Sequence, residues 1–213
     1  DEFVSAGLTA SIYSSASDGN NGGDIYYLSL CENDSLTRMI LADVLGHGEH
    51  VSQMSKMIFQ AIKSHLNDAS GDKLLSELNQ TLLQIGLEAM TTLVMAAFYR
   101  FDGNLYLANA GHPNLLFKPK DASNWIEVKP PKGINDPALG ALLEATYTQS
   151  SVQLNSGDCL MLYSDGLTEA HHKKNGYFTT SRLIELLNQY PKAPASKLKR
   201  IVINEIGRFT EGN

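Results

Sequence analysis

The pattern of apolar and polar residues predicts groups of strands that are interrupted and followed by pairs of helices. Runs rich in β-branched, aromatic and other apolar residues predict strands. These runs cover residues 4–13, 24–30, 37–43, 92–101, 105–110, 115–118, 125–128, 146–154 and 159–163. Apolar residues at helical spacing predict helices around 51–62, 74–85, 181–189 and 197–209.

The order of these elements favours the α+β class. Asp102-Gly103 is a favoured turn pair, so the runs on either side of it should form a hairpin. We expect 115–118 and 125–128 to extend the same sheet. Because the helices come in pairs and do not alternate with single strands, the pattern favours mixed sheets covered by amphipathic helices over a doubly wound βαβ fold.

One apolar run ends on a single carboxylate. Met39–Ala42 is apolar, Asp43 follows it, and Gly46 and Gly48 come just before a predicted helix. A strand buried on both faces would hold Asp43 rigidly at the rim of a sheet. Carboxylate and backbone carbonyl oxygens are the ligands that hard divalent cations prefer. The alternative is that Asp43 only caps the helix, and this segment by itself supports both roles equally.

Two further acids have similar settings. Asp165 follows the apolar run at 159–163 and precedes Gly166, and Asp24 follows Gly22-Gly23 at the start of a strand. If the three strand ends meet at one rim, their carboxylates repel each other unless cations or protons intervene. The alternative is that each Asp only forms a turn, as Asp-Gly pairs commonly do.

Composition narrows the classes of function. The 213 residues suit one domain, and a net charge of −6 without a basic block argues against a nucleic-acid or anionic-membrane surface. No apolar run approaches a membrane span, and no signal-peptide pattern is seen. Cys31 and Cys159 lack metal-site spacing, which favours a reduced, cytoplasmic compartment. The glycines do not follow dinucleotide-binding or P-loop spacing.

Several segments resemble, in the same order, the signature motifs of one family. That family is the bacterial SpoIIE/RsbU-like branch of the metal-dependent serine/threonine protein phosphatases (PPM, or type 2C). The resemblance covers nearly the whole chain. The segments are Gly22–Tyr27, Asp43–Gly48, Asn109–Pro113, Leu139-Gly140 with Tyr147–Leu154 and Gly157-Asp158, and Leu162–Ala170.

This resemblance implies a four-layer αββα sandwich, in which two mixed or antiparallel sheets are flanked by helix pairs. It also implies a binuclear Mn²⁺ or Mg²⁺ site at one edge. Carried over residue by residue, Asp43 would bridge both ions, and Asp24 and the carbonyl of Val44 would complete one site. Asp165 would bind the other ion. These acids would be the catalytic residues, because a water activated by the ions attacks the phosphoryl group and no protein nucleophile is needed.

The chain departs from the family pattern in two places. We expect residues 1–213 to form a single phosphatase domain that lacks the last strand and the final acidic motif, since the chain ends at 209–213 where that strand should begin. Glu211 does not replace the missing acid. His47 resembles a histidine proposed as general acid in eukaryotic relatives, but the residues between it and Asp43 differ, and a role as a loop residue is favoured.

Three functions are compatible with these residues. The first is a phosphoserine/phosphothreonine protein phosphatase; by resemblance, its substrate would be a phosphorylated STAS-domain anti-sigma-factor antagonist in a partner-switching pathway. The second is a degenerate phosphatase domain that acts as a binding or regulatory module. The third is a hydrolase of another phosphoester, which the lack of a base-binding cluster disfavours. By analogy with the family, N-terminal sensor or receiver domains would precede Asp1.

Overall fold

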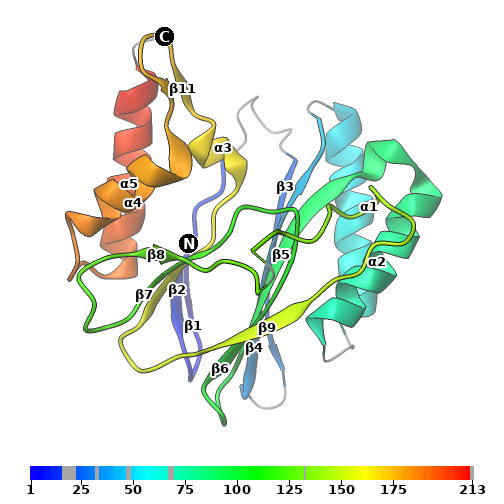
Figure 1. The fold of residues 1–213 in the computed structure, drawn as a ribbon, viewed down its shortest axis with the longest axis horizontal. Coiled ribbons are helices and arrows are strands. Elements are labelled where there is room, and N and C mark those ends of the chain that lie inside the picture. The colour runs from blue at the N-terminus through cyan, green and yellow to red at the C-terminus, as the bar shows by residue number, and fades with distance from the viewer. Residues whose placement is uncertain (16–22, 32–33, 47–48, 67–69, 132, 212–213) are drawn as a thin grey trace. The chain divides into compact units, whose positions relative to one another are not determined.

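The computed structural model describes residues 1–15, 23–31, 34–46, 49–66, 70–131 and 133–211. The chain divides into two compact units. The first unit consists of Asp1–Tyr13, Leu115–Val128 and Asn155–Asn213, and the second of Ser14–Asn114 and Lys129–Leu154. Each unit combines strands with a pair of long helices, and the first unit also contains a helix of one turn (Figure 1).

The second unit contains a five-stranded antiparallel sheet with the strand order β3-β4-β5-β6-β9. Helices α1 and α2 lie on one face of this sheet (Figure 1), and a short 3₁₀ helix, η1, follows α2. The bounds are β3 Asp24–Cys31, β4 Leu36–Val44, α1 Glu49–His65, α2 Gly71–Ile85, η1 Leu87–Ala89, β5 Thr91–Tyr99, β6 Asn104–Ala110 and β9 Gln149–Gln153.

The apolar stripes of α1 and α2 form the core of the second unit together with one face of the sheet. Ile58 and Ile62 of α1 and Leu78 of α2 have no exposed surface. They pack in one cluster with Ala42 and Val44 of β4, and with Leu93 and Met95 of β5. Burial of these stripes explains why the helical spacing could be read from the sequence, since most helix stability in proteins comes from such packing.

The first unit contains shorter strands, which pair as β1-β2, β10-β7-β8 and β11-β12, all antiparallel. Its core joins Trp125 and Leu116 to buried leucines of helices α4 and α5. The bounds are β1 Glu2–Val4, β2 Thr9–Ser11, β7 Leu116–Lys118, β8 Ile126–Glu127, β10 Cys159–Met161, α3 Asp165–Thr168, β11 His171–His172, β12 Gly176–Tyr177, α4 Thr179–Asn188 and α5 Ala195–Thr210.

The four predicted helices and the hairpin around Asp102-Gly103 are confirmed. The prediction of one strand over 4–13 is wrong, because the chain turns between β1 and β2. The Ser5 hydroxyl accepts hydrogen bonds from the backbone N–H groups of Gly7 and Leu8, at 3.3 and 3.1 Å. Such Ser-centred turns are local chemistry that a hydrophobic pattern does not report.

The expected sheet of β7 and β8 is also wrong. Both strands belong to the first unit, where β7 pairs with β10, and β9 occupies the edge of β6 in their place. Gly111 directly follows β6 and has a φ of 68°, so the chain turns there in a conformation that favours glycine. In the part of the chain that the structure describes, no helix is long and apolar enough to cross a membrane.

Asn79 provides a test of how the second unit is held together. It is 1% exposed, its amide donates to the Leu142 carbonyl at 3.0 Å, and its side-chain carbonyl accepts the Gly140 N–H at 2.8 Å. Asn79→Ala removes both bonds and takes away the partner of the buried Gly140 N–H, so we expect a loss of about 2 kcal/mol in the free energy of unfolding. Urea unfolding followed by circular dichroism measures it.

The matched control is Gln80→Ala on the same helix. The Gln80 side chain is exposed and reaches the Leu143 carbonyl at only 3.4 Å. We expect this variant to stay within about 0.5 kcal/mol of the wild type. Equal losses of unfolding free energy in the two variants would contradict the claim that the hydrogen bonds of Asn79 stabilise the second unit.

Candidate metal centre

Asp24 and Asp43 lie directly opposite each other on neighbouring strands. Asp24 is the first residue of β3, Asp43 is the last but one of β4, and the antiparallel register pairs them. Residues paired in this way point to the same face of the sheet, with Cβ atoms about 5 Å apart. The register therefore brings these two strand-end carboxylates next to each other.

Gly23 allows the backbone to approach these acids closely. A Cβ atom placed on Gly23 would lie 2.8 Å from the Val44 carbonyl oxygen and 2.9 Å from Oδ1 of Asp43. These distances are shorter than any ordinary carbon–oxygen contact, so a side chain at this position would force the two oxygens apart. The carbonyl of Val44 and the carboxylate of Asp43 thus converge on a space that only glycine leaves open.

Helix α1 lies against the corner formed by Gly23, Asp24, Asp43 and Val44. The Ser55 hydroxyl donates to the Val51 carbonyl at 2.9 Å and lies 3.4 Å from the Gly23 carbonyl. Gly46 has a φ of 104°, which confirms that the turn after Asp43 uses glycine for its backbone freedom. Three other residues of the predicted motifs, Gly22, His47 and Gly48, lie outside the described residues.

The donor set of this corner suits a hard divalent cation. Two carboxylates and one backbone carbonyl supply only oxygen, which is what Mg²⁺ and Mn²⁺ bind. Within the described residues, no group of three or more His, Cys, Asp or Glu side chains could hold an ion. The oxygens that the second unit could offer to an ion are therefore those of Asp24, Asp43 and the carbonyl of Val44, and water or other groups would have to fill the further positions.

Asp165 belongs to the first unit, where it opens the four-residue helix α3. The sequence predicts a strand running into this acid, but β10 ends at Met161. The backbone carbonyl of Asp165 accepts hydrogen bonds from Glu169 N–H at 2.7 Å and from the Thr168 hydroxyl at 3.2 Å. Its side chain is half-buried. A helix of one turn is too short for the periodicity that identifies longer helices.

The strand next to Asp43 is supported by His112, which belongs to the Asn109–Pro113 motif of the sequence. The register places Thr92 of β5 opposite Asp43, and the Thr92 hydroxyl lies 2.8 Å from Nδ1 of His112. His112 is 1% exposed. The Asn109 side chain bonds both the N–H and the carbonyl of His112, at 2.8 and 2.9 Å. The Asn-Ala-Gly-His segment therefore builds a rigid support next to the Asp43 strand.

Comparison with known proteins gives consistent matches. A family model described as Stage II sporulation protein E (SpoIIE) matches residues 33–213. The phosphoserine phosphatase RsbU of Bacillus subtilis (strain 168) is 26% identical over 184 residues, which are 85% of this chain and 53% of RsbU. Protein IcfG of a Synechocystis species is 33% identical over 86 residues, 40% of this chain and 13% of that protein. The chain thus spans about half of RsbU and a smaller part of IcfG.

Solved structures show the same fold. The RsbU and RsbW domains of a Mycobacterium tuberculosis protein superpose with a TM-score of 0.77 at 21% identity, over 92% of this chain and 53% of that one. The SiaA PP2C domain of Pseudomonas aeruginosa has a TM-score of 0.77 at 19% identity, over 90% of this chain and 75% of that one. The SpoIIE phosphatase domain of Bacillus subtilis, with a fragment of its regulatory domain, has a TM-score of 0.76 at 18% identity, over 93% of this chain and 57% of that one. The predicted α+β fold class is confirmed.

Gly23→Ala tests the geometry of the candidate centre. The added methyl group would displace the Val44 carbonyl and Oδ1 of Asp43, so we expect the affinity for Mn²⁺ to fall at least about tenfold, the size of effect seen when supports of metal ligands are altered. Electron paramagnetic resonance of free Mn²⁺ during a titration measures it. Gly207→Ala, where an added Cβ meets nothing within 4 Å, should bind Mn²⁺ like the wild type. Equal affinities in all three proteins would contradict the assignment.

Proposed function

Because this chain belongs to the SpoIIE family, we propose that it is a metal-dependent protein serine/threonine phosphatase. The observation that carries the proposal is the cross-strand pair of Asp24 and Asp43 beside the Val44 carbonyl. RsbU, which carries the name phosphoserine phosphatase, is similar over 85% of this chain. The alternative of an inactive binding module has less support in the geometry, since Asp24 and Asp43 are both present and directly paired.

The proposed roles are those that the resemblance to the family implies, and the positions of the Asp24, Asp43 and Val44 oxygens support them. Asp43 would bridge two Mn²⁺ or Mg²⁺ ions, because its carboxylate has two oxygens at the end of a rigid, buried strand. Asp24 and the Val44 carbonyl would complete the first position, and Asp165 would serve the second. Ions held there would supply Lewis acidity and a nucleophile derived from water. Gly23 keeps the corner open, and Thr92 with His112 holds the neighbouring strand in place.

We further propose that the substrate is the phosphorylated form of a STAS-domain protein, an anti-sigma-factor antagonist. Two similarities support this class of partner. The Mycobacterium tuberculosis structure joins an RsbU domain to an RsbW domain, and another solved neighbour, at a TM-score of 0.65 and 17% identity, comes from work on the bacterial stressosome. A cytoplasmic location would suit such a partner, and it agrees with Cys31 and Cys159 both being free thiols.

Hydrolysis of p-nitrophenyl phosphate with and without Mn²⁺ tests the enzymatic proposal. We expect activity that requires Mn²⁺, and we expect Asp43→Asn to reduce kcat/KM by about a thousandfold or more, because the bridging carboxylate would be lost. The matched control is Asp121→Asn, an exposed acid of the first unit, which should retain wild-type activity.

The remaining outcomes separate the alternatives. Asp43→Asn with unchanged activity would overturn the proposed role of this acid. No Mn²⁺-dependent hydrolysis of either p-nitrophenyl phosphate or a phosphoserine peptide, in a protein whose circular dichroism is that of a folded chain, would favour the binding-module function. Hydrolysis of nucleotides in preference to phosphoserine peptides would indicate a phosphoesterase of another class.

A further inference from the structure

Strand β3 forms one edge of the five-stranded sheet and is unusually open to pairing. Among the described residues it pairs only with β4, through eight consecutive register positions without a bulge. Its sequence, Asp-Ile-Tyr-Tyr-Leu-Ser-Leu-Cys, contains no Pro, Lys or Gly. Natural sheets usually protect an edge with such residues, with bulges or with very short strands. The opposite edge, β9, follows the usual rule, because it is five residues long and mostly polar.

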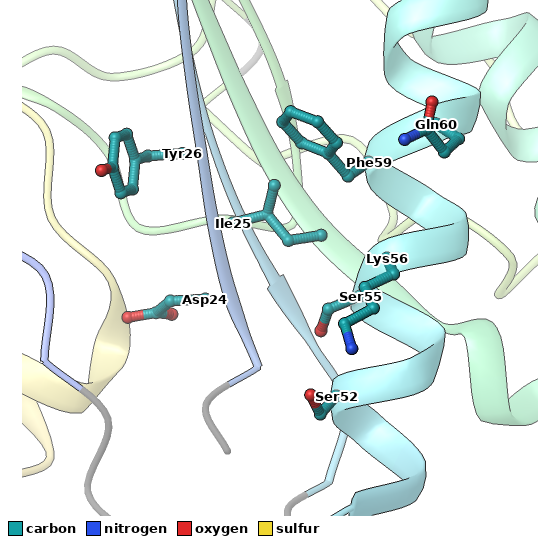
Figure 2. A pocket seen from close by; sticks show the side chains of 8 residues that line it. All are labelled: Asp24, Ile25, Tyr26, Ser52, Ser55, Lys56, Phe59 and Gln60. Carbon is teal, nitrogen blue, oxygen red and sulfur yellow. The ribbon is translucent and has the colours of Figure 1, made fainter. Parts of the chain in front are cut away.

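A groove of about 310 Å³ runs between this edge and helix α1. Figure 2 shows Ile25 pointing toward the helix, whereas Asp24 and Tyr26 point to the other side of the strand. Ile25 is 6% exposed and forms an apolar floor with Phe59. The helix contributes Lys56 and Gln60, both exposed, to the polar wall. The groove thus combines a strand edge, an apolar floor and a cation.

Asp24 lines one end of the groove and is also a candidate ligand of the metal centre. Because the side chains of a strand alternate between the two faces of a sheet, a chain paired with β3 would place some side chains on the groove face and others on the face of Asp24, where we place the chemistry. Backbone groups along a strand edge can bond an extended peptide of any sequence, and pockets beside the strand select side chains. Lys56 adds a preference for negative charge, which a phosphorylated segment carries.

We propose that this groove binds an extended segment of the phosphoprotein substrate, which adds as a further strand to the edge of β3 and places its phosphoserine at the Asp24 end. The inference rests on the proposed phosphatase function. The competing occupant is β3 of a second copy of this chain. The substrate is favoured because β3, which borders the groove, begins at Asp24 of the candidate metal centre, and because the groove carries a lysine; strand pairing between copies would use neither.

Hydrogen exchange provides a direct test that does not depend on catalysis. The probe is a synthetic peptide with acidic residues around a phosphonate that replaces the phosphoserine ester, used with and without Mn²⁺. We expect slower exchange of backbone amides in β3 under both conditions, because the peptide bonds that edge. A peptide with N-methyl groups on alternate residues should give no protection, since it cannot complete the ladder. Protection absent from β3, or unchanged by N-methylation, would overturn the proposal.

Lys56→Glu tests the side-chain part of the groove. We expect the dissociation constant of the acidic phosphonate peptide to rise about fivefold, the size of effect typical of an exposed charge pair. For phosphoserine peptides the same change should appear in KM, while kcat and the hydrolysis of p-nitrophenyl phosphate stay at wild-type values. Lys73→Glu on α2, an exposed lysine outside the groove, is the matched control and should change none of these quantities.

These measurements separate failure of the groove proposal from failure of the phosphatase proposal. If β3 is protected by the peptide but no phosphoester is hydrolysed, the groove stands as a binding site and the proposed enzymatic function fails. If p-nitrophenyl phosphate is hydrolysed and β3 shows no protection, the enzyme stands and the groove proposal fails. A concentration-dependent dimer, measured by light scattering, together with slow exchange of the β3 amides in the absence of peptide would assign the edge to a second copy.

Discussion

The pairing of two carboxylates at one end of a sheet is the constraint around which the second unit is arranged. Asp24 and Asp43 occupy directly opposite positions in the β3–β4 register. Like charges placed opposite each other on a sheet destabilise it, and the neighbouring pair of this register, Ile25 and Ala42, is apolar. A divalent cation converts this repulsion into attraction. The arrangement is therefore explained most simply as a site that is completed by a metal ion.

The rest of the second unit makes this corner rigid. Ala42 and Val44, on either side of Asp43, are almost fully buried under the helix pair. Their burial fixes the strand, and the strand fixes the direction of the Asp43 carboxylate. Gly23 and Gly46 then allow the backbone to close around the acids, and Ser55 attaches helix α1 to the same corner. Packing in the core thus determines the position of groups whose chemistry takes place at the surface.

Much of this could be predicted from the sequence, because the relevant signals are local. The apolar run before Asp43 identified β4, and the helical stripes identified α1, α2, α4 and α5. The strand pairings were harder to predict. Whether β7 extends β6 or pairs with β10 depends on contacts far apart in the sequence, which periodicity does not contain.

The site shows the same division between local and long-range information. The acids and glycines could be named from the sequence, since their residue types and neighbours point to metal chemistry. The close approach of Gly23 to Val44 and the support of Thr92 by His112 could not, because each depends on the registers that bring separate segments together. A one-residue slip of β3 against β4 would move Asp24 to the other face and remove the pair altogether.

Calorimetric unfolding with and without Mn²⁺ tests the central claim most directly. If Asp24 and Asp43 together hold a cation, Mn²⁺ should raise the Tm of the wild type, because a ligand that binds only the folded state stabilises it. The double variant Asp24→Asn/Asp43→Asn should lose this increase while its Tm without metal stays equal to or above that of the wild type. A wild-type Tm that does not respond to Mn²⁺, or a double variant that responds equally, would contradict the account.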